Sequence, residues 1–292
     1  MAKLKNDLVK EKDLREYLNS YSDFNFELLT LKMLKEKGLE CVHGGLYEDP
    51  ITGINRQFDI RATKTINNYR VKIAAECKNI RENYPILVLC APRHEHESFH
   101  QVAILNEPPH GSSLSPRTIF QSRASIFTVE GMHSIYKPYE FVGKNITQVG
   151  RVSDGTIQAN DNELFNKWSQ CLGSANDLVK RIYLEGKDIK CSVFFFTIIP
   201  ILVIPNETLW IVNYDFAGGI VSGPRLADRI SYFVDKVYKT DAEATIISHE
   251  IRHEIRISHI EIMTQHGLEN FIDTYLQTET GIQQIFPTAR RE

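Results

Sequence analysis

Hydrophobic and polar positions alternate along two stretches that flank the pair Asn67-Asn68. The first stretch opens with Phe58-Asp59-Ile60, and in the second, Tyr69–Lys78, the apolar side chains recur at every second position. A two-residue period is typical of a strand with one buried face. Asparagine pairs favour turns. The pattern therefore predicts two strands joined at Asn67-Asn68.

A different period precedes them. Residues 23–38 have the three-to-four-residue spacing of an amphipathic helix, with Asp23 as the N-cap and Gly38 at the C-terminal end. Lysines lie opposite the apolar side. The buried stripe is predicted to contain Phe24, Leu28, Leu31 and Leu34.

The rest of the chain divides into further elements by the same patterns. Helices are predicted at residues 3–19, 162–184, 225–238 and from about Thr264 onward. Strands are predicted at residues 86–90, 125–130, 191–199 and 208–214, with a turn at 205–207.

This order of elements predicts an α/β fold in which helices flank a mixed central β-sheet. We expect a single domain over residues 1–292, with an N-terminal helix at 1–20 and a motif-bearing core at 21–80. Residues 82–160 are expected to be an insertion after the third core strand. Residues 161–292 would supply the remainder of the core and the C-terminal helices.

Composition excludes some classes of protein. The hydrophobic content of 42% favours a packed globule over disorder. Five cysteines without a C-x-x-C pair suggest reduced thiols, and the charged N-terminus does not resemble a signal peptide, so we expect a cytoplasmic protein. The most apolar run, 193–204, is too short to cross a bilayer and contains Pro200.

Candidate chemistry lies at the ends of the two alternating stretches. Parity places Glu76 and Lys78 on the polar face of the second strand, at a position where a solvated charge is poorly accommodated. A buried carboxylate needs a counter-charge or a metal ion. A salt bridge between Glu76 and Lys78 explains the Glu-x-Lys tripeptide about as well as a metal site does. Glu27 also has a structural explanation, because an acidic side chain near the start of a helix interacts favourably with the helix macrodipole.

The order of these elements resembles the PD-(D/E)XK nuclease superfamily, most closely its Mrr-like, restriction-endonuclease-like members. A helix with Glu27 is followed by a strand, a strand with Asp59, and a strand with Glu76-x-Lys78. The motif covers roughly residues 24–80. Phe58 replaces the proline that gives the superfamily its name.

The resemblance implies a role for each residue. Asp59 and Glu76 would bind Mg²⁺ or Mn²⁺ with the backbone carbonyl of Cys77, and Glu27 would be an accessory ligand. Lys78 would orient or deprotonate the attacking water. The implied protein is a metal-dependent endonuclease of DNA, or of RNA, in restriction or phage defence, with a second copy or a defence-system protein as partner. Its net charge of −3 requires a local basic groove for nucleic acid.

Two other hypotheses remain. One is a catalytically inactive nuclease fold that serves as a binding module. The other is a zinc metallohydrolase, because His249-Glu250-x-x-His253 is a zinc-binding pattern when it lies on a helix, and His259 has the spacing of a third ligand. However, Arg256 replaces the glycine needed between the second and third ligands, and the region is rich in β-branched residues, which favours strands with exposed histidines.

A second histidine-rich stretch, residues 93–100, alternates in charge and is predicted to be a solvated loop. In a nuclease, this loop would leave the sheet just beyond Lys78. Its Arg93, together with Arg117 and Arg123, would then be able to contact phosphate.

Overall fold

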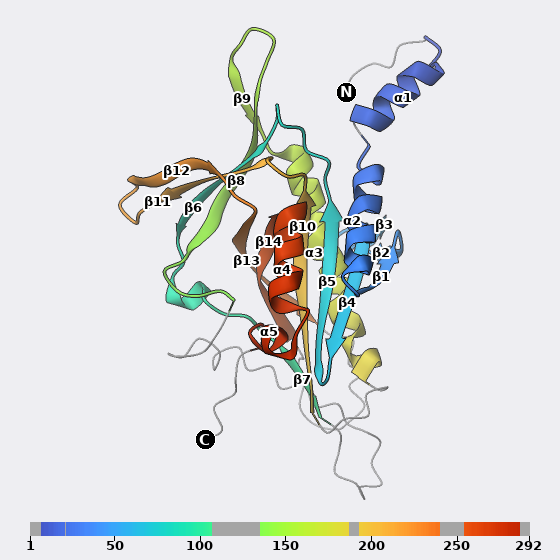
Figure 1. The fold of residues 1–292 in the computed structure, drawn as a ribbon, viewed down its shortest axis with the longest axis vertical. Helices are drawn as coiled ribbons and strands as arrows, with labels where there is room; N and C mark the ends of the chain where they lie inside the picture. Colours follow the sequence, from blue (N-terminus) through green and yellow to red (C-terminus); the bar gives the residue numbers. More distant parts are fainter. Residues whose placement is uncertain (1–6, 21, 107–134, 187–192, 240–253, 287–292) are drawn as a thin grey trace, which may run out of the picture.

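The computed structural model describes residues 7–20, 22–106, 135–186, 193–239 and 254–286 (Figure 1). The HExxH residues His249 to His253, the arginines Arg117 and Arg123, and the predicted strand 125–130 lie outside these ranges. The helices are α1 (Glu11–Ser20), α2 (Phe24–Glu36), the 3₁₀ turn η1 (Glu95–Glu97), α3 (Asn162–Gly186), α4 (Gln265–Tyr275) and α5 (Glu279–Gln283).

Within the described residues, one large mixed sheet of 12 strands forms the centre of the molecule, and a small hairpin lies beside it. The hairpin pairs β2 (Leu46–Glu48) with β3 (Asn55–Gln57). The large sheet contains β1 (Glu40–His43), β4 (Ile60–Ile66), β5 (Tyr69–Cys77), β6 (Ile86–Pro92), β7 (Ala103–Asn106), β8 (Phe141–Arg151), β9 (Ile157–Asn160), β10 (Val193–Ile204), β11 (Leu209–Tyr214), β12 (Ile220–Leu226), β13 (Arg229–Lys239) and β14 (Glu254–Thr264).

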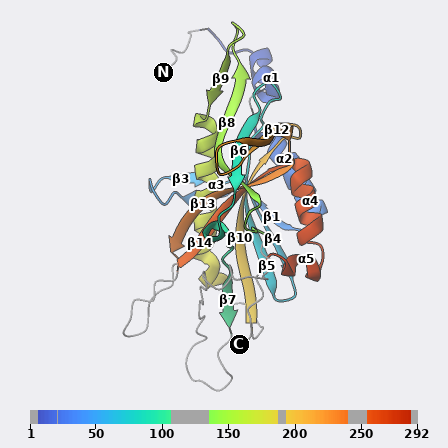
Figure 2. The same ribbon diagram turned by 90° about the vertical axis from the view of Figure 1, so that its left-hand side faces the viewer.

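The predicted α/β class with a mixed sheet and flanking helices is confirmed. The strand order is β1-β4-β5-β10-β14-β13-β8-β6-β11-β12, with β7 beside β10 and β9 beside β8. β1, β4 and β5 run antiparallel, whereas β10 is parallel to both β5 and β14. Figure 2 shows α3 on one face of the sheet and α2, α4 and α5 on the other.

The hairpin of β4 and β5 forms where the alternating pattern predicted it. Ile66 pairs with Tyr69, so Asn67 and Asn68 are the two loop residues, and Asn67 has the positive φ of 52° that such tight turns require. Ala75 and Cys77 pack into the core under α2 and α4. Glu76 points to the opposite face because side chains alternate along a strand.

Pro200 lies inside the central strand β10, where a missing N–H is usually unfavourable. On the side away from β5, β10 pairs with β7 through Phe196 and with β14 only from Ile201 onward. Pro200 falls between these two ladders.

One predicted helix was wrong, and the predicted buried stripe of α2 was right for Leu34 and in part for Leu31 but wrong for Phe24 and Leu28. Residues 225–238 form the end of β12 and most of β13, because the apolar residues Ile230 to Val234 fit either period and long-range pairing with β14 decides between them. In α2 the buried residues are Phe26, Thr30 and Leu34, while Phe24 and Leu28 are exposed, because the sheet contacts the helix from a side rotated away from the expected stripe.

Two other boundaries differ from expectation, and one is as predicted. Residues 7–10 precede α1, which begins at Glu11. Within the segment 82–160, β6, β7, β8 and β9 join the same sheet as the strands that flank Asp59 and Glu76. The helix predicted from Thr264 is confirmed as α4, with Thr264 as its N-cap.

Candidate functional site

The hairpin of β4 and β5 brings together two acidic residues that lie far apart in the sequence. Asp59 immediately precedes β4, and Glu76 is the penultimate residue of β5; Ile60 pairs with Ala75. The backbone N–H of Asp59 donates to Glu76 Oε1 at 3.4 Å, and that of Cys77 donates to Asp59 Oδ2 at 2.8 Å. The predicted proximity of Asp59 and Glu76 is therefore present.

A lysine from α3 contacts both carboxylates. Lys167 Nζ lies 2.9 Å from Asp59 Oδ2 and 3.8 Å from Glu76 Oε2. The parity of β5 aims Glu76 toward the sheet face that α3 covers, and α3 carries Lys167 one residue before the buried Trp168. Sequence analysis missed Lys167 because nothing in the local pattern of the helix distinguishes it from a surface lysine.

Asp59, Glu76 and Lys167 form a cluster of charged groups that is largely buried. Glu76 is 0% exposed, and burial, followed by the nearby charge of Asp59, raises its pKa well above the usual value. Burial lowers the pKa of Lys167, but the charges of Asp59 and Glu76 outweigh it and raise that pKa overall. Among the described residues, Glu76 Oε2 has no hydrogen-bond partner.

Lys78 is linked to this centre through Asp23. Lys78 Nζ lies 3.5 Å from Asp23 Oδ2, and Lys167 Nζ lies 3.8 Å from the same oxygen. Asp23 precedes α2 but makes no side-chain cap; its Oδ1 instead accepts from the backbone N–H of Asn79 at 2.8 Å. Asp23 therefore ties the start of α2 to the chain just after β5, which the N-cap prediction did not foresee.

Glu27 lies near Asp59 and forms a separate hydrogen bond with His43. Its Oε2 lies 3.3 Å from His43 Nε2 at the end of β1. Burial raises the pKa of Glu27, the charge of Asp59 raises it further, and the hydrogen bond with His43 opposes both effects. Glu27 is thus in electrostatic reach of Asp59, as an accessory ligand would be, while His43 was not predicted.

The two facing carboxylates suit a hard divalent cation. Among the described residues, no three side chains of histidine, cysteine, aspartate or glutamate meet closely enough to hold a metal ion. Magnesium, however, is commonly bound through one or two carboxylates, with water and substrate phosphate completing its shell. The buried Glu76 Oε2, which has no hydrogen-bond partner in the described part of the chain, is an oxygen that such an ion would coordinate.

A groove of about 690 Å³ begins at Lys78 and extends between α1 and the strands β8 and β9. Its cationic side chains are Lys78, Arg81 and Arg151, and among its described lining residues none is acidic. The remaining lining residues are Tyr17, Asn79, Ile80, Asn83, Tyr84, Gln148, Gly150, Val152, Gln158 and Asn160. A chain of net charge −3 therefore has a local basic groove beside its carboxylate pair.

The histidine predicted as a third zinc ligand has a structural role. His259 lies within strand β14 and is buried, so the expectation of exposed histidines is wrong for this residue. Its Nδ1 bonds Ser258 Oγ at 2.8 Å, and its Nε2 accepts from Arg93 Nε at 3.2 Å. Burial, followed by the charge of Arg93, lowers its pKa well below the usual value, so the ring is neutral and the nitrogen lone pair is occupied.

Comparison with known proteins gives no relative: no protein-family model, curated protein or solved structure matches the chain. None of the described helices combines the length and the apolar character needed to cross a membrane.

Proposed function

We propose that this protein is a metal-dependent endonuclease that hydrolyses phosphodiester bonds of DNA. The observation that carries the proposal is the pairing of Asp59 with the buried Glu76, whose Oε2 lacks a hydrogen-bond partner among the described residues, next to a basic groove. Phosphodiester hydrolysis requires a cation, an ordered water and a surface that tolerates negative charge.

The connectivity around the site supports the resemblance to the PD-(D/E)XK superfamily. Helix α2 carries Glu27 and is followed by β1, by Asp59 at the start of β4, and by Glu76 near the end of β5. After β5 the chain forms β6, β7, β8 and β9, and then continues through α3 and returns as β10, parallel to β5.

Each residue of the site would have a separate role in the reaction. Asp59 and Glu76 would hold Mg²⁺ or Mn²⁺, with the Cys77 carbonyl as a further oxygen donor, and Glu27, which is engaged by His43, would be an accessory ligand through water. When bound, the cation would supply Lewis-acid chemistry to the scissile phosphate. Lys78 lines the groove and would orient the attacking water, while Lys167 keeps a positive charge against Asp59 and Glu76.

The test incubates the full chain with plasmid, linear duplex, single-stranded DNA and RNA, each with Mg²⁺, with Mn²⁺ and with EDTA. We expect cleavage of DNA that requires the cation. Asp59→Asn should abolish it, and Lys78→Ala should lower it by about 100-fold or more, the usual contribution of a positioned acid–base group. Asp215→Asn, at an exposed turn, is the matched control and should cleave normally.

The other hypotheses give different results in the same experiment. DNA binding without cleavage by any cation would indicate an inactive binding module. Stoichiometric zinc in the purified protein, lost on His253→Ala, would indicate a zinc hydrolase. Cleavage that survives Asp59→Asn would contradict the assigned site.

A further inference from the structure

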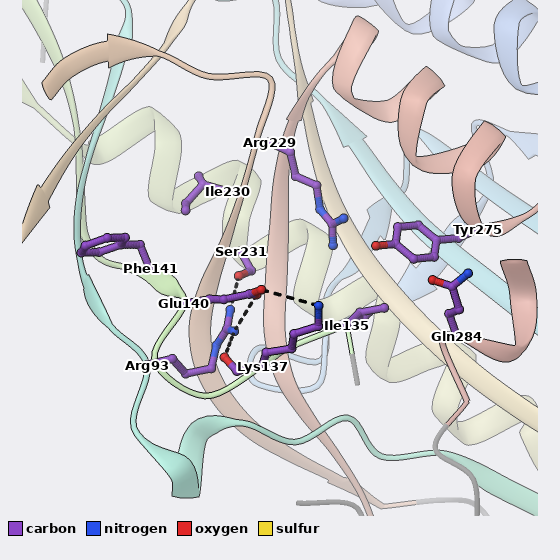
Figure 3. A pocket seen from close by; sticks show the side chains of 10 residues that line it. All are labelled: Arg93, Ile135, Lys137, Glu140, Phe141, Arg229, Ile230, Ser231, Tyr275 and Gln284. Atoms are coloured by element: carbon purple, nitrogen blue, oxygen red, sulfur yellow. Dashed lines mark hydrogen bonds and ion pairs between the residues drawn. The ribbon is translucent and has the colours of Figure 1, made fainter. Parts of the chain in front are cut away.

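A second polar pocket, none of whose described lining residues belongs to the carboxylate site, lies beside β13 and α4 (Figure 3). It has a volume of about 290 Å³ and lies between β13, the segment leading into β8, and the last residues of α4 and α5. Its lining residues are Arg93, Ile135, Lys137, Glu140, Phe141, Arg229, Ile230, Ser231, Tyr275 and Gln284.

Arg93 brings a buried positive charge to this pocket, although its loop was predicted to be solvated. Its side chain is 2% exposed, and its three closest hydrogen bonds go to neutral acceptors: His259 Nε2 at 3.2 Å, the Lys137 carbonyl at 2.7 Å and Ser231 Oγ at 2.6 Å. Its ion pair with Glu140 is long, 3.8 Å, and Glu140 is 54% exposed. Burial therefore lowers the pKa of Arg93 despite the surrounding carboxylates.

Two more cations face the same space. Arg229 holds the buried Glu261 with Nε at 2.7 Å and Nη2 at 3.2 Å, and Figure 3 shows its guanidinium directed toward the middle of the pocket. Lys137 is 62% exposed and lies 3.8 Å from Glu140. The Tyr275 hydroxyl and the Gln284 amide point inward from the opposite wall (Figure 3).

We propose that this pocket binds a phosphate monoester group. Among the residues that the structure describes, Arg93, Lys137 and Arg229 contribute three positive charges, whereas Glu140 and Glu261 contribute two negative charges, so a net positive charge remains for an anion. Arg93 and Lys137 approach from one wall and Arg229 from another, and the Tyr275 hydroxyl and the Gln284 amide face them (Figure 3). This arrangement suits the several outward-facing oxygens of a phosphate dianion better than a flat carboxylate.

This site is separate from the proposed nuclease centre. The Arg229 guanidinium lies over the Phe271 and Tyr275 rings of α4, whereas Glu76 faces the side of the sheet covered by α3. Phosphate binding here requires no divalent cation and no cleavage, so its test is independent of the proposed function.

The experiment titrates inorganic phosphate into the full chain by calorimetry, with EDTA present and ionic strength held constant with chloride. Two exposed substitutions should act in opposite directions. Lys137→Gln removes a cation and should weaken binding by about 3- to 10-fold, while Glu140→Gln removes the competing carboxylate and should strengthen it by a similar factor. Neither side chain is buried, so both variants are expected to fold.

The pair Lys32 and Glu36 provides the matched controls. These side chains are also exposed and also lie 3.8 Å apart, but on α2, away from the pocket. Lys32→Gln and Glu36→Gln change the net charge in the same way and should leave phosphate affinity unchanged. Equal effects of the control and pocket variants would overturn the proposal, as would the absence of phosphate binding by the unaltered protein.

The source of the phosphate group can be found with the same variants. Adenosine monophosphate tests for a free nucleotide, and a short DNA oligonucleotide with or without a 5′-phosphate tests for a nucleic-acid end. Support requires that affinity for at least one phosphorylated probe falls in Lys137→Gln and rises in Glu140→Gln. If no phosphorylated probe binds more weakly to Lys137→Gln and more tightly to Glu140→Gln, the pocket is not a phosphate site.

Discussion

At the scale of single residues, Glu76 shows the conflict between stability and chemistry most clearly. It is fully buried, faces the carboxylate of Asp59, and has Lys167 as a cation at 3.8 Å. Its pKa is raised by burial and then by Asp59, so the folded state holds a proton there more tightly than the unfolded chain does. This group's contribution to stability is therefore present below its unfolded pKa and is lost as pH rises through its raised folded pKa.

We expect Glu76→Gln to stabilise the metal-free protein. The amide has nearly the same shape but carries no charge, and it leaves Lys167 paired with Asp59 at 2.9 Å. The gain in unfolding free energy should be about 1–2 kcal/mol at pH 8, where more of the Glu76 carboxyl is ionised than near pH 4, because the substitution removes a buried carboxylate whose desolvation Lys167, at 3.8 Å, offsets only in part. It should shrink near pH 4. Urea unfolding in EDTA measures it.

The same substitution should abolish DNA cleavage with Mg²⁺. Glu36→Gln, an exposed residue of α2, is the control and should change neither stability nor cleavage. A Glu76→Gln protein that is less stable at pH 8 than the unaltered chain would contradict this account of Glu76.

At the scale of elements, α4 depends on how closely its first turn approaches the sheet. Thr264 caps the helix by accepting from the backbone N–H of Gly267 at 3.0 Å, and it also donates to the Asp228 carboxylate at 2.9 Å. A Cβ built on Gly267 would lie 1.9 Å from the Asp228 carbonyl oxygen. The helix can lie this close to the residues before β13 only because position 267 has no side chain.

Gly267→Ala is therefore expected to destabilise the protein, although alanine is the better helix former. The clash is with backbone, which cannot rotate away, so the loss should be about 2–3 kcal/mol rather than the gain of nearly 1 kcal/mol seen at open helix positions. Thermal or urea unfolding measures it. Asn270→Ala, at an exposed position of the same helix, should be nearly neutral. A stabilised Gly267→Ala variant would show that this contact is absent.

At the scale of the whole molecule, the distribution of charge matters more than its sum. The chain has a net charge of −3, yet the described lining of the groove presents Lys78, Arg81 and Arg151 and no acidic residue, although Lys78 pairs with Asp23 beside the groove at 3.5 Å. A local positive surface of this kind attracts a polyanion even when the whole protein is acidic.

Binding of DNA in this groove should weaken as salt increases. Three phosphate contacts predict a slope of log K against log salt of about −2 for single strands and about −3 for duplex. Arg81→Gln and Arg151→Gln should each reduce the slope by slightly less than one unit. The measurement is fluorescence anisotropy in EDTA, where no cleavage occurs.

The control is Arg225→Gln, an exposed arginine of β12 outside the groove. Its slope should equal that of the unaltered protein. If the groove variants keep the full slope, nucleic acid binds elsewhere on the surface.

The sequence by itself determined the features that depend on near neighbours. The alternation around Asn67-Asn68 predicted the hairpin of β4 and β5 and the side of the strand on which Glu76 lies. The periodicity of residues 162–184 predicted α3, and Thr264 marked the start of α4. These features were accessible because period, turn chemistry and capping act over a few residues.

Only the tertiary structure decided which distant side chains meet. Lys167 reaches Asp59 across 108 positions of the chain, and Arg93 is buried beside a pocket. Asp23 is the N-cap residue of α2, as predicted, but its carboxylate accepts from the Asn79 N–H instead of from the helix. The strand β13 was mistaken for a helix for the same reason, since its apolar run fits both periods until β14 pairs with it. Such contacts depend on how the sheet and helices pack against one another, and local sequence patterns do not encode that packing.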